Sequence, residues 1–150
     1  MLAPGDRAPA FSLEGDDGKT HTLKEFSGKT LILYFYPKDN TPGCTTQACD
    51  LRDSLPSFKK RKAVVVGVSP DSIASHGKFR DKHNLDFLLL ADPDHAVAEK
   101  YGAWGDKVLY GKKYKGIIRS TFVIDGNGKI ASAHYKVSPK GHADAILETL

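Results

Sequence analysis

A continuous apolar segment runs from Thr30 to Tyr36 and is followed, after Pro37, by a helix-start pattern. The segment is rich in β-branched and aromatic residues, which predicts a strand buried on both faces. Thr41 is a good helix N-cap, and Pro42 falls at the first helical position, where its missing N–H costs nothing. The sequence therefore predicts a buried strand, a short loop and a helix that begins at Pro42.

Both cysteines of the chain, Cys44 and Cys49, lie in this predicted helix. Gly43 adds little bulk at the turn, and Cys44 falls in the first helical turn, near unpaired N–H groups and the positive end of the helix dipole. Such a position stabilises a thiolate, which is the nucleophilic form of cysteine. The alternative is a small buried core residue, since free cysteines are commonly packed in this way. Position alone does not decide between the two.

Cys49 favours redox chemistry. On a continuous helix, a step of five residues separates two Cα atoms by about 8–9 Å, which is more than the roughly 7 Å that a disulfide bridges. A permanent disulfide is therefore not expected, but a transient one can form if the first helical turns unwind. Two thiols that pair only after local unfolding suggest a redox cycle.

Other cysteine chemistries fit the spacing less well. Metal sites usually use C-x2-C pairs with further ligands, and thiol–disulfide oxidoreductases use C-x-x-C. Asp50 occupies the position that a phosphatase-like Cys-x5-Arg motif gives to arginine. His76 and His83 lack a third ligand, so we expect surface residues rather than a metal site. A Cys–His protease pair stays open, because such partners meet only in the fold.

The spacing Pro37-x3-Thr41-x2-Cys44 matches the active-site motif of peroxiredoxins. The longer stretch 36–49 resembles the peroxiredoxin Q subfamily, also called bacterioferritin comigratory protein. Further segments resemble the same family in the same order, over almost the whole chain: 3–11, 101–104, 110–114 and 119–125. The resemblance implies an α/β structure, the thioredoxin fold with peroxiredoxin insertions.

The resemblance also implies a mechanism. Cys44 would attack a hydroperoxide and become a sulfenic acid, and Cys49 would resolve this as an intramolecular disulfide. Thioredoxin, or alternatively glutaredoxin, would then reduce the disulfide by thiol exchange. Thr41 would hydrogen-bond the peroxide, Arg119 would stabilise the thiolate and the transition state, and Pro37 would shape and shield the pocket. These steps need no metal, haem or flavin.

A second function class stays open. A thioredoxin-fold binding or holdase protein could use its cysteines only to sense redox state, without peroxidase turnover. The joint presence of Pro37, Thr41, Cys44 and Arg119 favours the peroxidase, with a role in antioxidant defence, because a binding protein has no need of that set.

Composition sets the broad class. The chain has 150 residues, 40% of them hydrophobic and 27% charged, which is typical of one soluble domain spanning residues 1–150. No stretch approaches the roughly 20 apolar residues of a membrane span, and the N-terminus lacks the apolar core of a signal peptide. Reactive cysteines favour the reducing cytoplasm, although a trimmed plastid precursor would look the same. An intramolecular cysteine pair makes a monomer sufficient.

The basic character of the chain does not indicate nucleic-acid binding. The net charge is +4, and the densest basic run is 59–62. We expect this run to end a helix, where cations complement the dipole, because neither interleaved aromatics nor a second basic stripe accompanies it. Nucleotide binding is not expected either, since Leu23 stands where a phosphate-binding loop ending in Gly28-Lys29-Thr30 requires glycine.

The remaining segments predict a mixed sheet with helices on both faces. The expected elements are a hairpin of 10–13 with 21–23, a helical turn at 23–26, strands at 63–69 and 86–91, helices at 72–83 and 94–101, a hairpin of 117–125 with 129–136, and a helix from Pro139. We expect 102–116 to be a long loop, which either walls the substrate pocket or packs Trp104 at the core edge.

Overall fold

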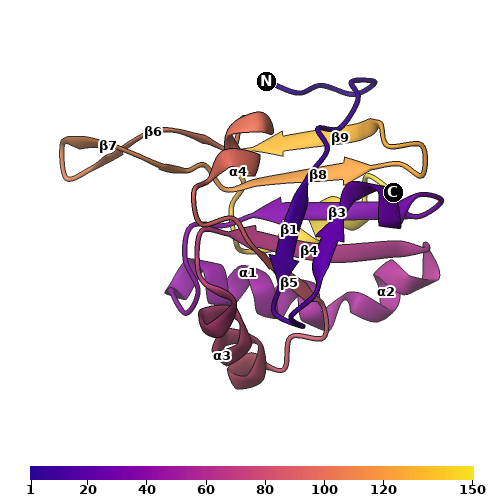
Figure 1. The fold of residues 1–150 in the computed structure, drawn as a ribbon, viewed down its shortest axis with the longest axis horizontal. Coiled ribbons are helices and arrows are strands. Elements are labelled where there is room, and N and C mark those ends of the chain that lie inside the picture. Colours follow the sequence, from indigo (N-terminus) through magenta and orange to yellow (C-terminus); the bar gives the residue numbers. More distant parts are fainter.

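The predicted buried strand is β3 (Thr30–Phe35), which lies inside a seven-stranded mixed sheet with the order β2-β1-β5-β4-β3-β8-β9 (Figure 1). β3 runs parallel to β4 (Ala63–Ser69), and β4 runs parallel to β5 (Leu88–Ala91). On its other side, β3 pairs antiparallel with β8 (Ser120–Ile124). The computed structural model describes all residues, 1–150.

The other elements follow the predicted order with shifted boundaries, with one exception. They are β1 (Ser12–Gly15), β2 (Thr20–Thr22), a 3-10 turn (Leu23–Phe26), α1 (Pro42–Asp53), α2 (Leu55–Lys60), α3 (Ile73–His83), α4 (Ala96–Lys100), β9 (Ile130–Tyr135) and α5 (His142–Leu147). The exception is that two helices, α1 and α2, lie between β3 and β4 where one was predicted. The final helix starts three residues later than predicted, after Gly141 in the left-handed region with φ 72°. As predicted, the basic run closes a helix, with Lys59 and Lys60 in the last turn of α2.

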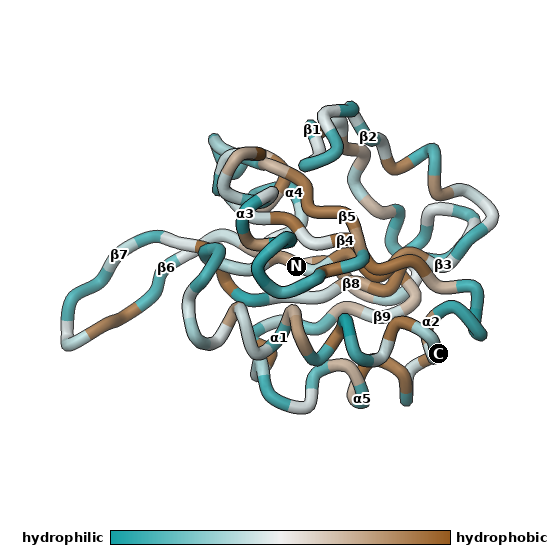
Figure 2. The backbone as a smooth tube through the Cα atoms, turned by 90° about the horizontal axis from the view of Figure 1, so that it is seen from below, coloured by the Kyte–Doolittle hydropathy of each residue, from teal (hydrophilic) through white to brown (hydrophobic).

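Alternate side chains of β3 enter two hydrophobic clusters, one on each face of the sheet. Leu31, Leu33 and Phe35 join a cluster that includes residues of α4, while Ile32 and Tyr34 join a cluster that includes residues of α1, α2, α3 and α5. Figure 2 shows the hydrophobic residues concentrated in these central strands. The prediction of a strand buried on both faces, with helices on both sides, is therefore confirmed.

The segment 102–116 is not a loop, so that prediction is wrong. It forms a separate two-stranded antiparallel sheet of β6 (Trp104–Leu109) and β7 (Lys112–Ile117), which extends away from the rest of the molecule (Figure 1). Its turn consists of Tyr110 and Gly111, with φ values of 51° and 75°. Two positive φ values are the mark of a tight type I′ hairpin turn, which Asn-Gly usually signals. Tyr-Gly does not carry that signal.

The base of this hairpin packs on the body of the protein. Trp104 is half-buried against the hydrophobic cluster that contains Leu31, Leu33 and Phe35. Its ring stacks on the ring of His95, with the two centroids 3.6 Å apart. Trp104 therefore lies at the core edge. Farther along the hairpin, Val108, Leu109 and Tyr110 are exposed.

His76 is also placed differently from the prediction. Its side chain is completely buried, whereas His83 is half-buried and packs on the ring of Phe79. The buried face of α3 consists of His76 and Phe79, so a histidine stands where an apolar residue would usually pack. None of the helices combines the length and the apolar character needed to cross a membrane.

Candidate active site

The start of α1 has the predicted geometry. Thr41 is the N-cap residue with φ −86° and ψ 153°, and Pro42 is the first helical residue. The Thr41 hydroxyl does not cap the helix, because it donates its hydrogen to the Lys38 carbonyl oxygen at 2.8 Å. The hydroxyl oxygen of Thr41 is consequently left to accept an O–H group from a ligand.

Cys44 lies in the first turn of α1 and is 1% exposed. An Arg119 guanidinium nitrogen, Nη2, donates to the Cys44 sulfur at 3.4 Å, and the other, Nη1, donates to the Gln47 side-chain oxygen at 2.6 Å. A fixed cation at this distance stabilises a thiolate. The residue that meets the sulfur is an arginine, so Cys44 does not form the Cys–His pair of a protease.

Gly43 allows Arg119 to approach the helix start. A Cβ atom at Gly43 would lie 3.3 Å from Arg119 Nη2 and 3.6 Å from Pro139 Cγ. The first distance is tighter than ordinary van der Waals contact, so a larger residue would force the guanidinium to shift while it contacts the Cys44 sulfur.

Tyr34 and Lys107 add two further polar groups around Cys44. Burial, and then the negative charge of Cys44, raise the pKa of Tyr34 well above its usual value, so its phenol stays protonated. The Tyr34 hydroxyl is buried without a hydrogen-bond partner. Lys107, from β6, donates to the Ile117 carbonyl oxygen at 2.8 Å, and burial and the charge of Arg119 lower its pKa. Neither residue was singled out from the sequence.

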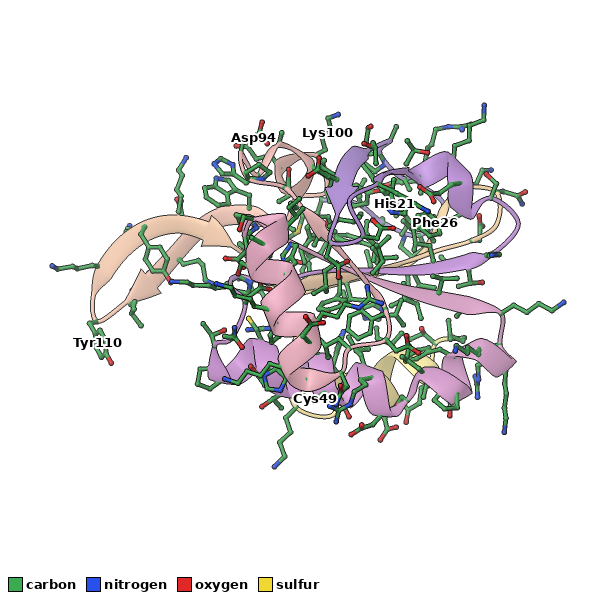
Figure 3. The ribbon with its side chains drawn as sticks, turned by 60° about the horizontal axis from the view of Figure 1, so that its bottom comes forward. His21, Phe26, Cys49, Asp94, Lys100 and Tyr110 are labelled. Atoms are coloured by element: carbon green, nitrogen blue, oxygen red, sulfur yellow. The ribbon has the colours of Figure 1, made fainter.

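The two cysteines are free and lie on the same unbroken helix. Cys49 is half-buried on α1 (Figure 3), and Pro37 is half-buried in the loop between β3 and α1. The structure thus brings Arg119 to Cys44 from a distant part of the sequence. It places Thr41 and Pro37 in the loop that leads to Cys44. It leaves Cys49 unbonded.

Residues 4–133 match the model of the AhpC/TSA family. The chain belongs to this family. It is 53% identical to the peroxiredoxin Bcp of Bacillus subtilis over 146 residues, which is 97% of this chain and 93% of the relative. These matches place the chain among the peroxiredoxins of the Q and Bcp type, and they support thiol peroxidase chemistry.

Solved peroxiredoxin structures share the fold. A cysteine mutant of the Xylella fastidiosa peroxiredoxin Q has a TM-score of 0.92 at 34% identity, covering 99% of this chain and 94% of its own. A structure of the Xanthomonas campestris bacterioferritin comigratory protein, from work on its alkyl peroxide reduction activity, has a TM-score of 0.87 at 41% identity, covering 92% and 88%. The predicted thioredoxin fold with a mixed sheet is therefore confirmed.

Gln47 is a residue of the candidate site that the sequence did not predict. It lies three residues after Cys44, on the same side of the helix, and is completely buried. Its oxygen fixes Arg119, while its amide nitrogen has no partner. A neutral amide can hold the guanidinium in place without cancelling its charge. The only signal in the sequence was a polar residue one turn after the cysteine.

Replacing Gln47 with glutamate should slow the reaction of Cys44 with peroxide about tenfold, a barrier increase of about 1.4 kcal/mol. A carboxylate would still bind Arg119 but would offset the positive charge that stabilises the thiolate. The rate of thiol loss in a single turnover measures this effect. Thr46→Glu is the control, because it adds the same charge at an exposed neighbouring position. Equal rates in the two variants would contradict this role for Gln47.

A second buried polar contact joins α5 to the sheet, and a backbone contact joins it to α1. His142 Nε2 lies 2.7 Å from the Thr121 hydroxyl, and the backbone N–H of Ala143 donates to Asp50 of α1 at 2.8 Å. Burial, and then the charge of His134, lower the pKa of His142 to about 4. His142 is therefore neutral in the folded protein at neutral pH.

The depressed pKa of His142 predicts acid sensitivity. The folded state favours the neutral His142 ring. The contribution of this ring to the free energy of unfolding is therefore complete above the unfolded pKa of 6.5 and is lost as the pH falls towards 4. At pH 4.5 the wild type should have lost about 2 kcal/mol of stability that His142→Gln does not lose. Urea unfolding at pH 7 and pH 4.5 measures the difference. The variant His83→Gln should behave like the wild type, and an equal acid loss in His142→Gln would contradict the assignment.

Proposed function

We propose that the chain is a thioredoxin-dependent peroxidase of the atypical 2-Cys type, which reduces hydrogen peroxide and organic hydroperoxides. The observation that carries the proposal is the Arg119 guanidinium at 3.4 Å from the sulfur of Cys44, at a helix N-terminus. The alkyl peroxide reduction activity named for the Xanthomonas campestris relative supports the organic substrates.

In the first step, the Cys44 thiolate attacks the terminal oxygen of the hydroperoxide. The S–O bond forms as the O–O bond breaks, and the leaving oxygen takes a proton and departs as water or an alcohol. The peroxide gains two electrons from the sulfur, which becomes a sulfenic acid. Arg119 stabilises the negative charge on the sulfur and the oxygens, Thr41 accepts the O–H of the substrate, and Pro37 shields the pocket.

In the second step, the Cys49 thiol attacks the sulfenic sulfur, forming the disulfide and releasing water. The first turns of α1 must unwind for this step, because Cys44 and Cys49 lie five residues apart on one helix. Thioredoxin then reduces the disulfide by exchange. Both thiols that form the disulfide belong to one chain, so a monomer suffices. A reducing cytoplasm suits a cycle that returns both thiols to the free state.

Peroxide consumption with NADPH, thioredoxin reductase and thioredoxin tests the proposal. We expect NADPH oxidation that requires the protein, the peroxide and thioredoxin together. Turnover only with glutaredoxin and glutathione would change the reductant but keep the peroxidase. A redox-sensing binding or holdase protein would give no turnover with either system, and a single-turnover thiol assay would then show whether Cys44 reacts with peroxide at all.

A further inference from the structure

A buried carboxylate anchors the loop between β3 and α1. Asp39 lies in this loop, and its side chain is 2% exposed. It accepts hydrogen bonds from the Tyr36 hydroxyl at 2.6 Å and the Ser75 hydroxyl at 2.8 Å, and it faces the Nδ1 atom of His76 at 2.7 Å. Ser75 and His76 belong to α3, so the loop is tied to a different helix from the one it leads into.

The backbone of Asp39 is anchored as well. Its N–H donates to the Asp71 carboxylate at 2.7 Å, and the same carboxylate oxygen accepts from the Ser69 hydroxyl at 2.8 Å. Asp71 lies between β4 and α3. Asp39 is thus held through both its side chain and its backbone by residues more than thirty positions away in the chain.

His76 must donate on both sides. Its Nε2 lies 2.9 Å from the Leu90 carbonyl oxygen, which can only accept, and its Nδ1 faces the Asp39 carboxylate. Burial opposes the charged ring, but Asp39, Leu90 and Asp71 together raise the pKa of His76 above its usual value. The imidazolium form therefore fits this geometry, and it makes a buried ion pair with Asp39.

Asp39, Asp71 and His76 each offer an atom within 4.8 Å of the others, which is close enough to hold a metal ion. These atoms already have protein partners, however. The Asp39 carboxylate accepts from Ser75 and pairs with His76, and the Asp71 carboxylate accepts from Ser69. The cluster is therefore satisfied by protein groups alone, which is the arrangement of a structural tether.

We propose that Asp39, Asp71, Ser75 and His76 form a latch that holds the loop 37–41 and the start of α1 in the folded form that reacts with peroxide. The proposal rests on the proposed function. Asp39 lies midway between Pro37 and Thr41, and five residues before Cys44. Unwinding the first turns of α1 for the attack by Cys49 has to move the chain that the latch holds.

The latch then acts on two rates in opposite directions. Attack on the peroxide needs the folded loop, whereas disulfide formation needs the unwound one, and each observed rate scales with the fraction of protein in its competent form. The four latch residues are positioning residues, because they act through the loop rather than on the substrate. A weaker latch should speed disulfide formation and slow peroxide attack.

Asp39→Asn and Ser75→Ala test the latch at two strengths. In a single turnover, we expect disulfide formation to become about tenfold faster in Asp39→Asn and about threefold faster in Ser75→Ala, with slower thiol loss to peroxide and less overoxidised Cys44. The loss of one hydrogen bond in Ser75→Ala keeps the test valid if Asp39→Asn fails to fold. Asp81→Asn, an exposed position on α3, should match the wild type.

The pH dependence gives a second measurement. The titratable groups that face His76 are Tyr36 and Asp39, which both follow the end of β3, and Asp71 from the loop before α3. The pKa of His76 is raised in the folded protein. The stability that the charged His76 ring gives to the latch is therefore complete below its unfolded pKa of 6.5 and is lost as the pH rises through its folded pKa. Disulfide formation should accelerate over that rise in the wild type, and His76→Gln should lack this part of the profile.

The outcomes separate the latch from the proposed function. A wild type that does not react with peroxide would overturn the proposed function. A reactive wild type whose folded Asp39→Asn and Ser75→Ala variants form the disulfide no faster would overturn the latch alone, as would a His76→Gln profile identical to that of the wild type.

Discussion

Replacing Cys44 with serine should lower the rate of peroxide consumption by at least a factor of about a thousand. Replacing Cys49 with serine should instead stop turnover after each chain has reduced one peroxide. A serine hydroxyl at position 44 stays protonated at neutral pH and so offers no comparable nucleophile. In Cys49→Ser the thiolate and Arg119 remain, so the first step survives and the sulfenic acid accumulates.

The two serine variants are matched controls for each other, because each removes one sulfur from the same helix. Steady-state NADPH oxidation should be lost in both. Single-turnover peroxide loss and sulfenic-acid trapping should differ, with signal only in Cys49→Ser. If Cys44→Ser consumed peroxide at the wild-type rate, Cys44 would not be the nucleophile. If Cys49→Ser sustained turnover, another thiol would resolve the sulfenic acid.

Removing the Arg119 fork should cost about 100- to 1,000-fold in the rate of Cys44 oxidation, as measured by single-turnover thiol loss. In Arg119→Met, the thiolate and the developing charge on the peroxide oxygens lose their cation. Arg119→Lys keeps the charge, but one ammonium cannot reproduce two donors fixed on the Cys44 sulfur and the Gln47 oxygen. Its rate should therefore fall between those of the wild type and Arg119→Met.

Arg61→Met is the control for the loss of positive charge, because Arg61 is exposed and its guanidinium binds carbonyls near the C-terminus. Its rate should match the wild type at moderate ionic strength. If Arg119→Met reacted as fast as Arg61→Met, the short contact between the guanidinium and the Cys44 sulfur would have no role in the first step.

Local sequence signals were sufficient for the centre of the fold. The apolar run of β3 and the Thr41-Pro42 helix start act over a few residues, through burial and backbone geometry, and both were found where predicted. The roles of Thr41 and Pro37 came only from the family resemblance. They stay predictions until the variants are measured.

Local sequence signals could not predict the contacts between residues that are distant in the chain. Arg119 reaches Cys44 because β8 pairs antiparallel with β3 in a register that sets Ser120 opposite Phe35, next to the end of the strand. Nothing within a few residues of Arg119 or Gln47 reports that register. His76 was misplaced for a similar reason, since the carboxylate that makes its burial possible lies on the loop before α1.

The hairpin of β6 and β7 has a consequence for how concentrated the protein can become. Its two strands pair only with each other, so both outer edges are open to another chain, and Val108, Leu109 and Tyr110 are exposed near its end. Such edges invite intermolecular pairing. The lysines of β7, at 112, 113 and 115, oppose it, because two approaching hairpins would bring like charges together. Salt near 1 M shortens the screening length to about 3 Å, so we expect self-association to increase with the ionic strength of the solution.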